Sequence, residues 1–277
     1  MKNYLKLVNF EFNRVAKLFA VLLGITFAAQ LAGVMFLARR YLNNAHEMIY
    51  IQMMPEAEFL ETWGRMSFLE IVRSEWFLGP IALCIAAVGI YIFFIWYRDW
   101  LGKNTFIYRL LMLPTTRLNL FYAKMTTILL ITLGLAGFQL IIFPVEIGIF
   151  NMMIPEEFRR DLGMLEIIQN VPELYMIIPA SFIQLVLFYG LGTLCVAIVF
   201  TGILLERSFK WKGIIAAILY GGAAALALIS PLLLQDFVLD GFFYPGELFT
   251  LVVVMGLIVF AACILMSRFL LKKKINV

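Results

Sequence analysis

Long apolar runs separated by short charged segments extend along the whole chain. A helix that crosses the roughly 30 Å hydrocarbon core of a bilayer needs about 20 mostly apolar residues. Six runs are long enough, so the pattern predicts an all-α, polytopic membrane protein with a single transmembrane domain, residues 1–277. We place the six spans near residues 18–38, 76–97, 125–145, 174–205, 213–235 and 248–267.

The fourth run is too long for one straight crossing. As a helix, its roughly 32 residues would reach about 48 Å, well beyond the hydrocarbon thickness. Proline removes a backbone donor, and glycine lacks the side chain that restricts the backbone. We therefore expect this span to tilt, or to bend at Pro179, Gly190 or Gly192.

The amino-terminal residues 2–19 have a helical period with one apolar and one polar face. Such a segment is suited to the plane of the lipid headgroups. We predict an N-terminal interfacial amphipathic helix, and the alternative is that the segment is only the solvated start of the first span. The apolar face consists of Tyr4, Leu5, Val8, Phe12, Val15 and Phe19.

Two longer connectors, residues 39–75 and 146–173, mix acidic side chains with aromatic and methionine side chains. Residues 56–75 alternate apolar and charged positions at helical spacing, and we expect short helices that pack on the membrane face. Glu146 follows Pro144 at the end of the third span. We interpret it as an ordinary acid at the membrane interface.

The composition agrees with a chain embedded in lipid, because 63% of the 277 residues are hydrophobic, 14% are charged and the mean hydropathy is +0.94. With both termini on one side of the membrane, that side holds 16 of the 22 basic residues and only 3 of the 18 acids. Basic residues in short loops stay on the cytoplasmic side. The sequence thus predicts cytoplasmic termini in a bacterial cytoplasmic membrane, and the basic charge reflects this topology rather than a nucleic-acid partner.

Residue types needed for cofactor or metal chemistry are scarce. The three cysteines lie in apolar runs, where they act as small hydrophobic residues. His46 is the one histidine, and Tyr50 stands where an HExxH zinc motif needs a second. Gly102-Lys103 is followed by Asn104 rather than Ser or Thr, so the chain has no phosphate-binding loop. We expect no metal or cofactor in this chain, and the spans lack the paired carboxylates that would indicate an intramembrane enzyme.

The connector between the second and third spans, residues 98–124, is too structured to be a simple link. Asn104 is a good helix N-cap and Pro114 a good stop, and together they enclose a short amphipathic helix. Such a helix can rest on lipid or fit into a groove of a partner protein. Its apolar face would hold Phe106, Ile107, Leu110 and Leu113, with Tyr108, Arg109 and Met112 opposite.

In this connector the sequence resembles the ABC-2 type permeases, the membrane-spanning subunits of ABC exporters. Their pattern is an acidic residue after the second span, a Leu-rich loop helix, Pro-[Ser/Thr]-x-Arg and a lysine that opens the third span. Asp99 stands where glutamate is more usual in that family. The matching positions are Asp99, Leu110 to Leu113, Pro114-Thr115-Thr116-Arg117 and Lys124.

The resemblance implies that residues 103–113 form a coupling helix that docks on a separate ABC ATPase, which would carry ATP and Mg²⁺. The amino-terminal helix would touch the same ATPase, and a second copy of this chain or a similar permease would complete the transporter. The docking residues would be Lys103, Asn104, Phe106, Ile107, Arg109, Leu110, Leu113, Pro114 and Arg117.

Polar side chains within the spans are few, and Gln30, Gln139 and Gln184 are candidate pathway residues. The alternative is that they form hydrogen bonds between helices. An apolar, aromatic-rich interior favours a hydrophobic or amphiphilic cargo such as an antimicrobial peptide, a drug or a lipid. An ATP-driven exporter is our leading hypothesis. An ion-coupled carrier or channel is the alternative, and it would need titratable groups buried within the spans.

Overall fold

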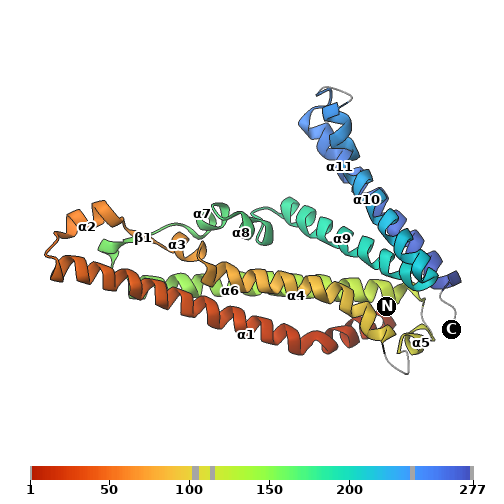
Figure 1. Ribbon diagram of the computed structural model, residues 1–277, viewed down its shortest axis with the longest axis horizontal. Coiled ribbons are helices and arrows are strands. Elements are labelled where there is room, and N and C mark those ends of the chain that lie inside the picture. Colours follow the sequence, from red (N-terminus) through yellow and green to blue (C-terminus); the bar gives the residue numbers. More distant parts are fainter. Residues whose placement is uncertain (1, 102–105, 113–115, 238–240, 275–277) are drawn as a thin grey trace. The chain divides into compact units, whose positions relative to one another are not determined.

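The computed structural model describes residues 2–101, 106–112, 116–237 and 241–274, which are helical almost throughout (Figure 1). Within these ranges, six helices are long and apolar enough to cross a membrane. The helical fold agrees with the all-α prediction, and the six helices have the length and composition of a multi-pass membrane protein. The six helices are α1 (Lys2–His46), α4 (Glu75–Trp100), α6 (Leu118–Met153), α9 (Phe182–Phe209), α10 (Trp211–Phe237) and α11 (Pro245–Phe269).

The amino-terminal segment is not a separate helix. α1 runs without interruption for 45 residues, or about 68 Å, and continues into the π-helix η1 (Glu47–Ile51). Its first turns bury a stripe at helical spacing formed by Leu7, Val8, Glu11 and Val15, whereas Leu5 is 61% exposed. The predicted N-terminal helix is therefore continuous with the first long helix, and its buried face includes an acid and packs within the chain.

The predicted fourth span is broken at Pro179. α8 (Pro172–Ile177) ends before this residue, and α9 begins at Phe182. Gly190 and Gly192 lie inside the unbroken α9, so the bend is confirmed at the proline and not at the glycines. The difference is physical, since a proline interrupts the backbone hydrogen-bond ladder and a helical glycine keeps it.

The two long connectors form short helices, as predicted. The first contains α2 (Glu56–Trp63) and α3 (Phe68–Val72), and the second contains the 3₁₀ turn η2 (Glu156–Phe158), α7 (Met164–Gln169) and α8. The sequence did not predict that the connectors also pair as strands. β1 (Met66–Ser67) and β2 (Arg159–Arg160) are parallel, with Met66 opposite Arg159 and Ser67 opposite Arg160.

The chain forms two compact units. Unit 1 comprises the described residues of Met1–Arg14, Gly89–Leu130 and Val186–Val277, and unit 2 comprises Val15–Val88 and Ile131–Leu185. Four long helices, α1, α4, α6 and α9, contribute residues to both units. The units are therefore not consecutive segments of the chain.

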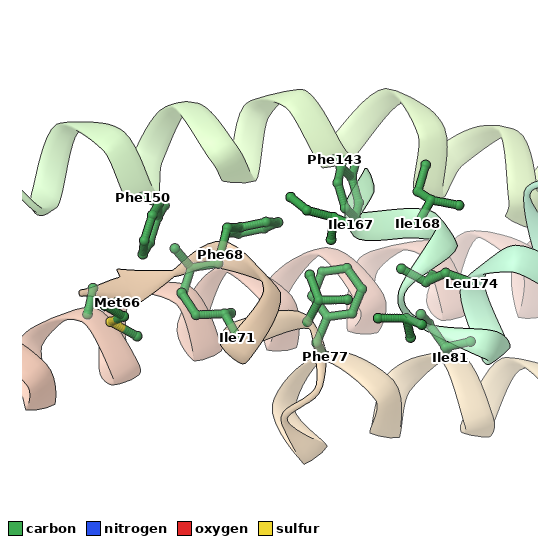
Figure 2. Packing of buried hydrophobic residues seen from close by; sticks show 14 of the residues in the cluster. Met66, Phe68, Ile71, Phe77, Ile81, Phe143, Phe150, Ile167, Ile168 and Leu174 are labelled. Carbon is green, nitrogen blue, oxygen red and sulfur yellow. The ribbon is translucent and has the colours of Figure 1, made fainter. Parts of the chain in front are cut away.

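Unit 2 has an aromatic core (Figure 2). Phe68 of α3 packs edge-to-face on Phe143 and Phe150 of α6, with ring centroids 5.5 and 5.7 Å apart, and Phe77 of α4 meets Phe143 at 6.0 Å. Aliphatic side chains complete this core from the short helices; they include Ile71, Ile167, Ile168 and Leu174. The connectors thus have a packed interior of their own rather than only resting on the membrane face.

In unit 1, α10 and α11 pack along each other, and α9 reaches α10 through a tight turn at Lys210, whose φ is 53°. Gly213 allows this close approach, because a Cβ there would lie 2.3 Å from the carbonyl oxygen of Leu205. Thr201 of α9 and Ser267 of α11 join through their hydroxyl groups at 3.1 Å. These contacts hold the ends of three long helices together.

Candidate functional site

Five charged side chains gather in unit 1 and form what we call the charge cluster: Glu11, Arg14, Arg98, Asp99 and Lys124. They come from the start of α1, the end of α4 and the start of α6. Glu11, Asp99 and Lys124 are fully buried. Buried charges are costly unless each is paired, so this arrangement ties three long helices to one point.

Lys124 is the centre of the charge cluster. Its ammonium group donates to Asp99 Oδ2 at 2.5 Å, to Glu11 Oε1 at 2.9 Å and to the backbone carbonyl of Ile95 at 2.7 Å. An ammonium group has three donors, and here all three are used. The indole of Trp96 also lies beneath it, 5.2 Å from Nζ.

The two arginines occupy the rim of the charge cluster. Arg14 Nη1 donates to Asp99 Oδ1 at 2.7 Å, and Arg98 Nη2 donates to Glu11 Oε2 at 2.9 Å. Their side chains are 25% and 18% exposed, so they connect the buried carboxylates to the surface. Each carboxylate oxygen therefore accepts a hydrogen bond from one cation, and Glu11 Oε2 also lies 3.7 Å from Arg14 Nη1.

The charge cluster also contacts the short helix α5 (Phe106–Leu111), which belongs to the same unit. The ring of Phe106 stacks on Phe10 of α1 with centroids 5.9 Å apart. The Arg14 guanidinium lies 5.2 Å from the Phe10 ring and 5.4 Å from the Phe106 ring. Stacked aromatic and cation–π contacts of this kind each contribute about 0.5–1.5 kcal/mol. One side chain, Arg14, thus touches both α5 and the charge cluster.

α5 is the described part of the predicted coupling helix. Ile107 is fully buried and Leu110 is 8% exposed, so these two predicted docking residues face the interior of the chain. Arg109 and Met112 are exposed, with Met112 at 65%, and they form the free side of the helix. Four predicted positions lie outside the described residues: Lys103, Asn104, Leu113 and Pro114.

Arg117, another predicted docking residue, contacts its own chain. Its Nη1 donates to the backbone carbonyl of Leu271 at 2.8 Å, and the side chain is half-buried. It therefore anchors η3 (Leu270–Lys274), the π-helix that follows α11.

The residues predicted for the interfacial helix have mixed positions in α1. The Tyr4 hydroxyl forms a 2.6 Å hydrogen bond with the Thr126 hydroxyl of α6, and Val8 is buried. Phe12 is half-buried, and Leu5 is the one of these four residues that is fully on the surface. Most of this predicted apolar face therefore stabilises the fold.

The candidate pathway glutamines form hydrogen bonds between helices. Gln30 of α1 donates through Nε2 to Gln139 Oε1 of α6 at 3.2 Å and to the Phe77 carbonyl at 3.3 Å. Gln184 of α9 donates to the hydroxyl of Tyr175 in α8. The alternative interpretation of these residues, contacts between helices, matches the geometry.

Glu146 is not an ordinary interfacial acid. Its side chain is fully buried within α6 of unit 2, and neither carboxyl oxygen has a hydrogen-bond partner among the described residues. The expectation failed because the third long helix continues to Met153, so Glu146 lies inside a helix and beside the aromatic core rather than at a helix end.

No group of three His, Cys, Asp or Glu side chains in the described ranges could hold a metal ion. The carboxylates of the charge cluster are occupied by Lys124 and the two arginines. The ion pairs of this site link three long helices.

The charge pattern along the sequence predicted the topology of these residues but not their pairing. The sequence did contain an indication of this pairing, because only three acids fall on the predicted basic side: Glu11, Asp99 and Glu206. The first two are in the charge cluster, and Glu206 accepts a hydrogen bond from the Tyr97 hydroxyl. An isolated acid in a basic segment next to a span is thus a useful marker of a buried ion pair.

No protein-family model, curated protein or solved structure matches the chain significantly.

Proposed function

We propose that this chain is the membrane-spanning permease subunit of an ATP-driven exporter of the ABC-2 type. The observation that carries the proposal is the contact of Arg14 with both Phe106 of α5 and Asp99 of the charge cluster. A helix meant to transmit force needs a firm attachment to the spans. α5 has such an attachment, because the charge cluster joins α1, α4 and α6.

The free face of α5 fits a docking role. Burial of Ile107, Leu110 and Leu111 fixes the helix to the chain, and the exposed Arg109 and Met112 remain for a partner. An exposed arginine beside an apolar methionine suits a groove with an acidic rim. The partner would be the ATPase subunit, and the docking surface would be narrower than the sequence alone predicted.

In the proposed mechanism, closure of the ATPases displaces α5. The displacement passes through the Phe10–Phe106 stack and Arg14 to the charge cluster, and so to the ends of three long helices. Breaking a buried ion pair costs about 3–5 kcal/mol, which makes the joint stiff on the scale of thermal energy. The helices would then move together and alternate access to the cargo.

The energy source and the cargo belong to the same proposal. The sequence has no phosphate-binding loop, so ATP and Mg²⁺ would be held by the separate ATPase. A second copy of the chain or a similar permease would complete the transporter in a bacterial cytoplasmic membrane. The cargo would be hydrophobic or amphiphilic, such as an antimicrobial peptide, a drug or a lipid, and would cross between largely apolar helices.

Site-specific photo-crosslinking in cells tests the docking surface. A photoreactive residue at Arg109 or Met112 should give adducts with an ATPase that contains a phosphate-binding loop, identified by mass spectrometry. The matched control is Met152, which is 89% exposed at the other end of α6. Adducts with lipid alone at Arg109, or the same protein adducts at Met152, would refute the proposal.

The proposal also requires α5 on the cytoplasmic side. Met112→Cys should react with a membrane-impermeant thiol reagent only after the membrane is opened. Met152→Cys should react in intact cells. The reverse labelling pattern would place α5 outside the cell, where it could not meet an ATPase.

An ion-coupled carrier is the second candidate, and Glu146 is the observation that favours it. Such carriers bury titratable groups within their spans, and Glu146 is a buried carboxyl group without a partner among the described residues. Transport into sealed vesicles that is driven by a proton gradient without ATP, and abolished by Glu146→Gln, would support this candidate over the exporter. Transport that needs ATP and survives Glu146→Gln would exclude it.

A further inference from the structure

A cluster of cations surrounds the turn between α9 and α10 and the end of α11 in unit 1. All of them are exposed. The Lys274 ammonium group lies 5.5 Å from the Phe209 ring of α9, which brings η3 next to this turn. We call this surface the basic end, and it consists of Lys210, Lys212, Arg268, Lys272, Lys273 and Lys274.

The basic end has no acidic counterpart in the described part of the chain. None of its cations forms a salt bridge with a described carboxylate, although such pairs are common elsewhere in the structure. The nearest acid in sequence, Glu206, is used by Tyr97 and Arg207. The charge of the basic end is therefore available to an anion.

Exposed aromatic side chains lie among these cations. Trp211 is 85% exposed, Phe269 is 43% exposed and Phe209 is 40% exposed. The Lys273 ammonium group lies 5.5 Å from the Phe269 ring. Exposed tryptophan and lysine at the end of a long apolar helix are typical of the level of the lipid headgroups.

The backbone of the basic end is held in place. Leu270 and Leu271 of η3 are buried, and Arg117 donates to the Leu271 carbonyl at 2.8 Å. The turn at Lys210 is tight, with Gly213 packed against the Leu205 carbonyl. Several ammonium groups thus project from a fixed frame, which lowers the entropy lost when they bind one ligand.

We propose that the basic end is a binding site for the headgroup of an anionic phospholipid. The ammonium groups would donate to the phosphodiester oxygens, and the acyl chains would lie along the exposed apolar surface of α10, which includes Ile214, Ile215 and Ile218. A surface with cations and aromatic rings directly beside lipid-length apolar helices suits a lipid better than a soluble anion. This inference does not depend on the transport proposal.

Electron spin resonance with spin-labelled lipids tests it on the full-length protein in phosphatidylcholine bilayers. We expect labelled phosphatidylglycerol to associate in preference to labelled phosphatidylcholine, with a preference that declines as salt is added. Each lysine near an anionic headgroup contributes about fivefold in affinity. Lys273→Gln/Lys274→Gln should therefore lose most of the preference, and Lys273→Arg/Lys274→Arg should keep it.

The matched control removes two exposed lysines of α1, Lys6→Gln/Lys17→Gln, and should keep the preference. Gel filtration confirms that each variant is folded. An equal loss in the control, or no preference in the wild type, would overturn the proposal. Displacement of the labelled lipid by inorganic phosphate, but not by chloride at equal ionic strength, would identify a free-phosphate site instead. Unchanged lipid preference in Lys273→Gln/Lys274→Gln would also overturn the proposal.

Discussion

Replacement of Lys124 by methionine tests whether the charge cluster holds the spans together. Methionine fills a similar volume, so little cavity forms, but the three contacts of the ammonium group with Asp99, Glu11 and the Ile95 carbonyl are lost. Asp99 then loses one of its two cations, and Glu11 loses one of its three. The free energy of unfolding should fall because these carboxylates are fully buried and lose a charged partner.

The magnitude follows from the contacts that remain. Removal of one partner of a buried ion pair costs about 3–5 kcal/mol. Arg14 still contacts Asp99 at 2.7 Å, and Arg98 still contacts Glu11 at 2.9 Å. We therefore expect the lower end, about 3 kcal/mol.

The assay is equilibrium unfolding in mixed micelles with increasing dodecyl sulfate, followed by the helical circular dichroism signal. Lys17→Met is the matched control, because it removes an exposed lysine from α1 and should change stability by less than about 0.5 kcal/mol. If Lys124→Met were as stable as Lys17→Met, the charge cluster would not be the joint that we describe.

Two further predictions concern close packing. Gly33→Ala should lower the free energy of unfolding by about 1–3 kcal/mol, because the new Cβ would lie 2.6 Å from the Trp76 Cβ. The control is Gly24→Ala on the same helix, where a Cβ would have no atom within 4 Å. In the same assay this variant should be neutral or slightly stabilising. Phe106→Ala should speed hydrogen exchange of the α5 amides at least severalfold, since the ring contacts with Phe10 and Arg14 are lost. Met112→Ala should leave the exchange unchanged, because that side chain is 65% exposed. Equal exchange in the two variants would contradict the anchoring of α5.

Hydrophobic runs predicted the number and approximate positions of the long helices. A membrane span needs a certain length and an apolar composition, and both can be read from consecutive residues. The break at Pro179 was predictable for the same reason, since it depends on the residue itself. The end of α6 was not, because an acid such as Glu146 is tolerated in a helix whose neighbours cover it.

The candidate site was harder to predict, because its members are far apart in the chain. Glu11 and Lys124 are separated by 113 positions and yet form a 2.9 Å ion pair. Periodicity identified the apolar face of α5 but could not tell whether a partner or the chain itself would cover Ile107 and Leu110. The answer depends on contacts between residues that are distant in the sequence. For Phe106 the covering contact is the stack on Phe10 of α1.

The pairing of β1 with β2 has a consequence for biosynthesis. Residues 66–67 must wait for residues 159–160, and roughly 90 residues lie between them. At about 5–20 residues per second the ribosome needs on the order of 5 to 20 seconds to supply the second strand. The ring of Phe68 likewise lacks its α6 neighbours, Phe143 and Phe150, until those residues have been translated. The nascent first connector is therefore the segment for which a chaperone on that face of the membrane would matter most.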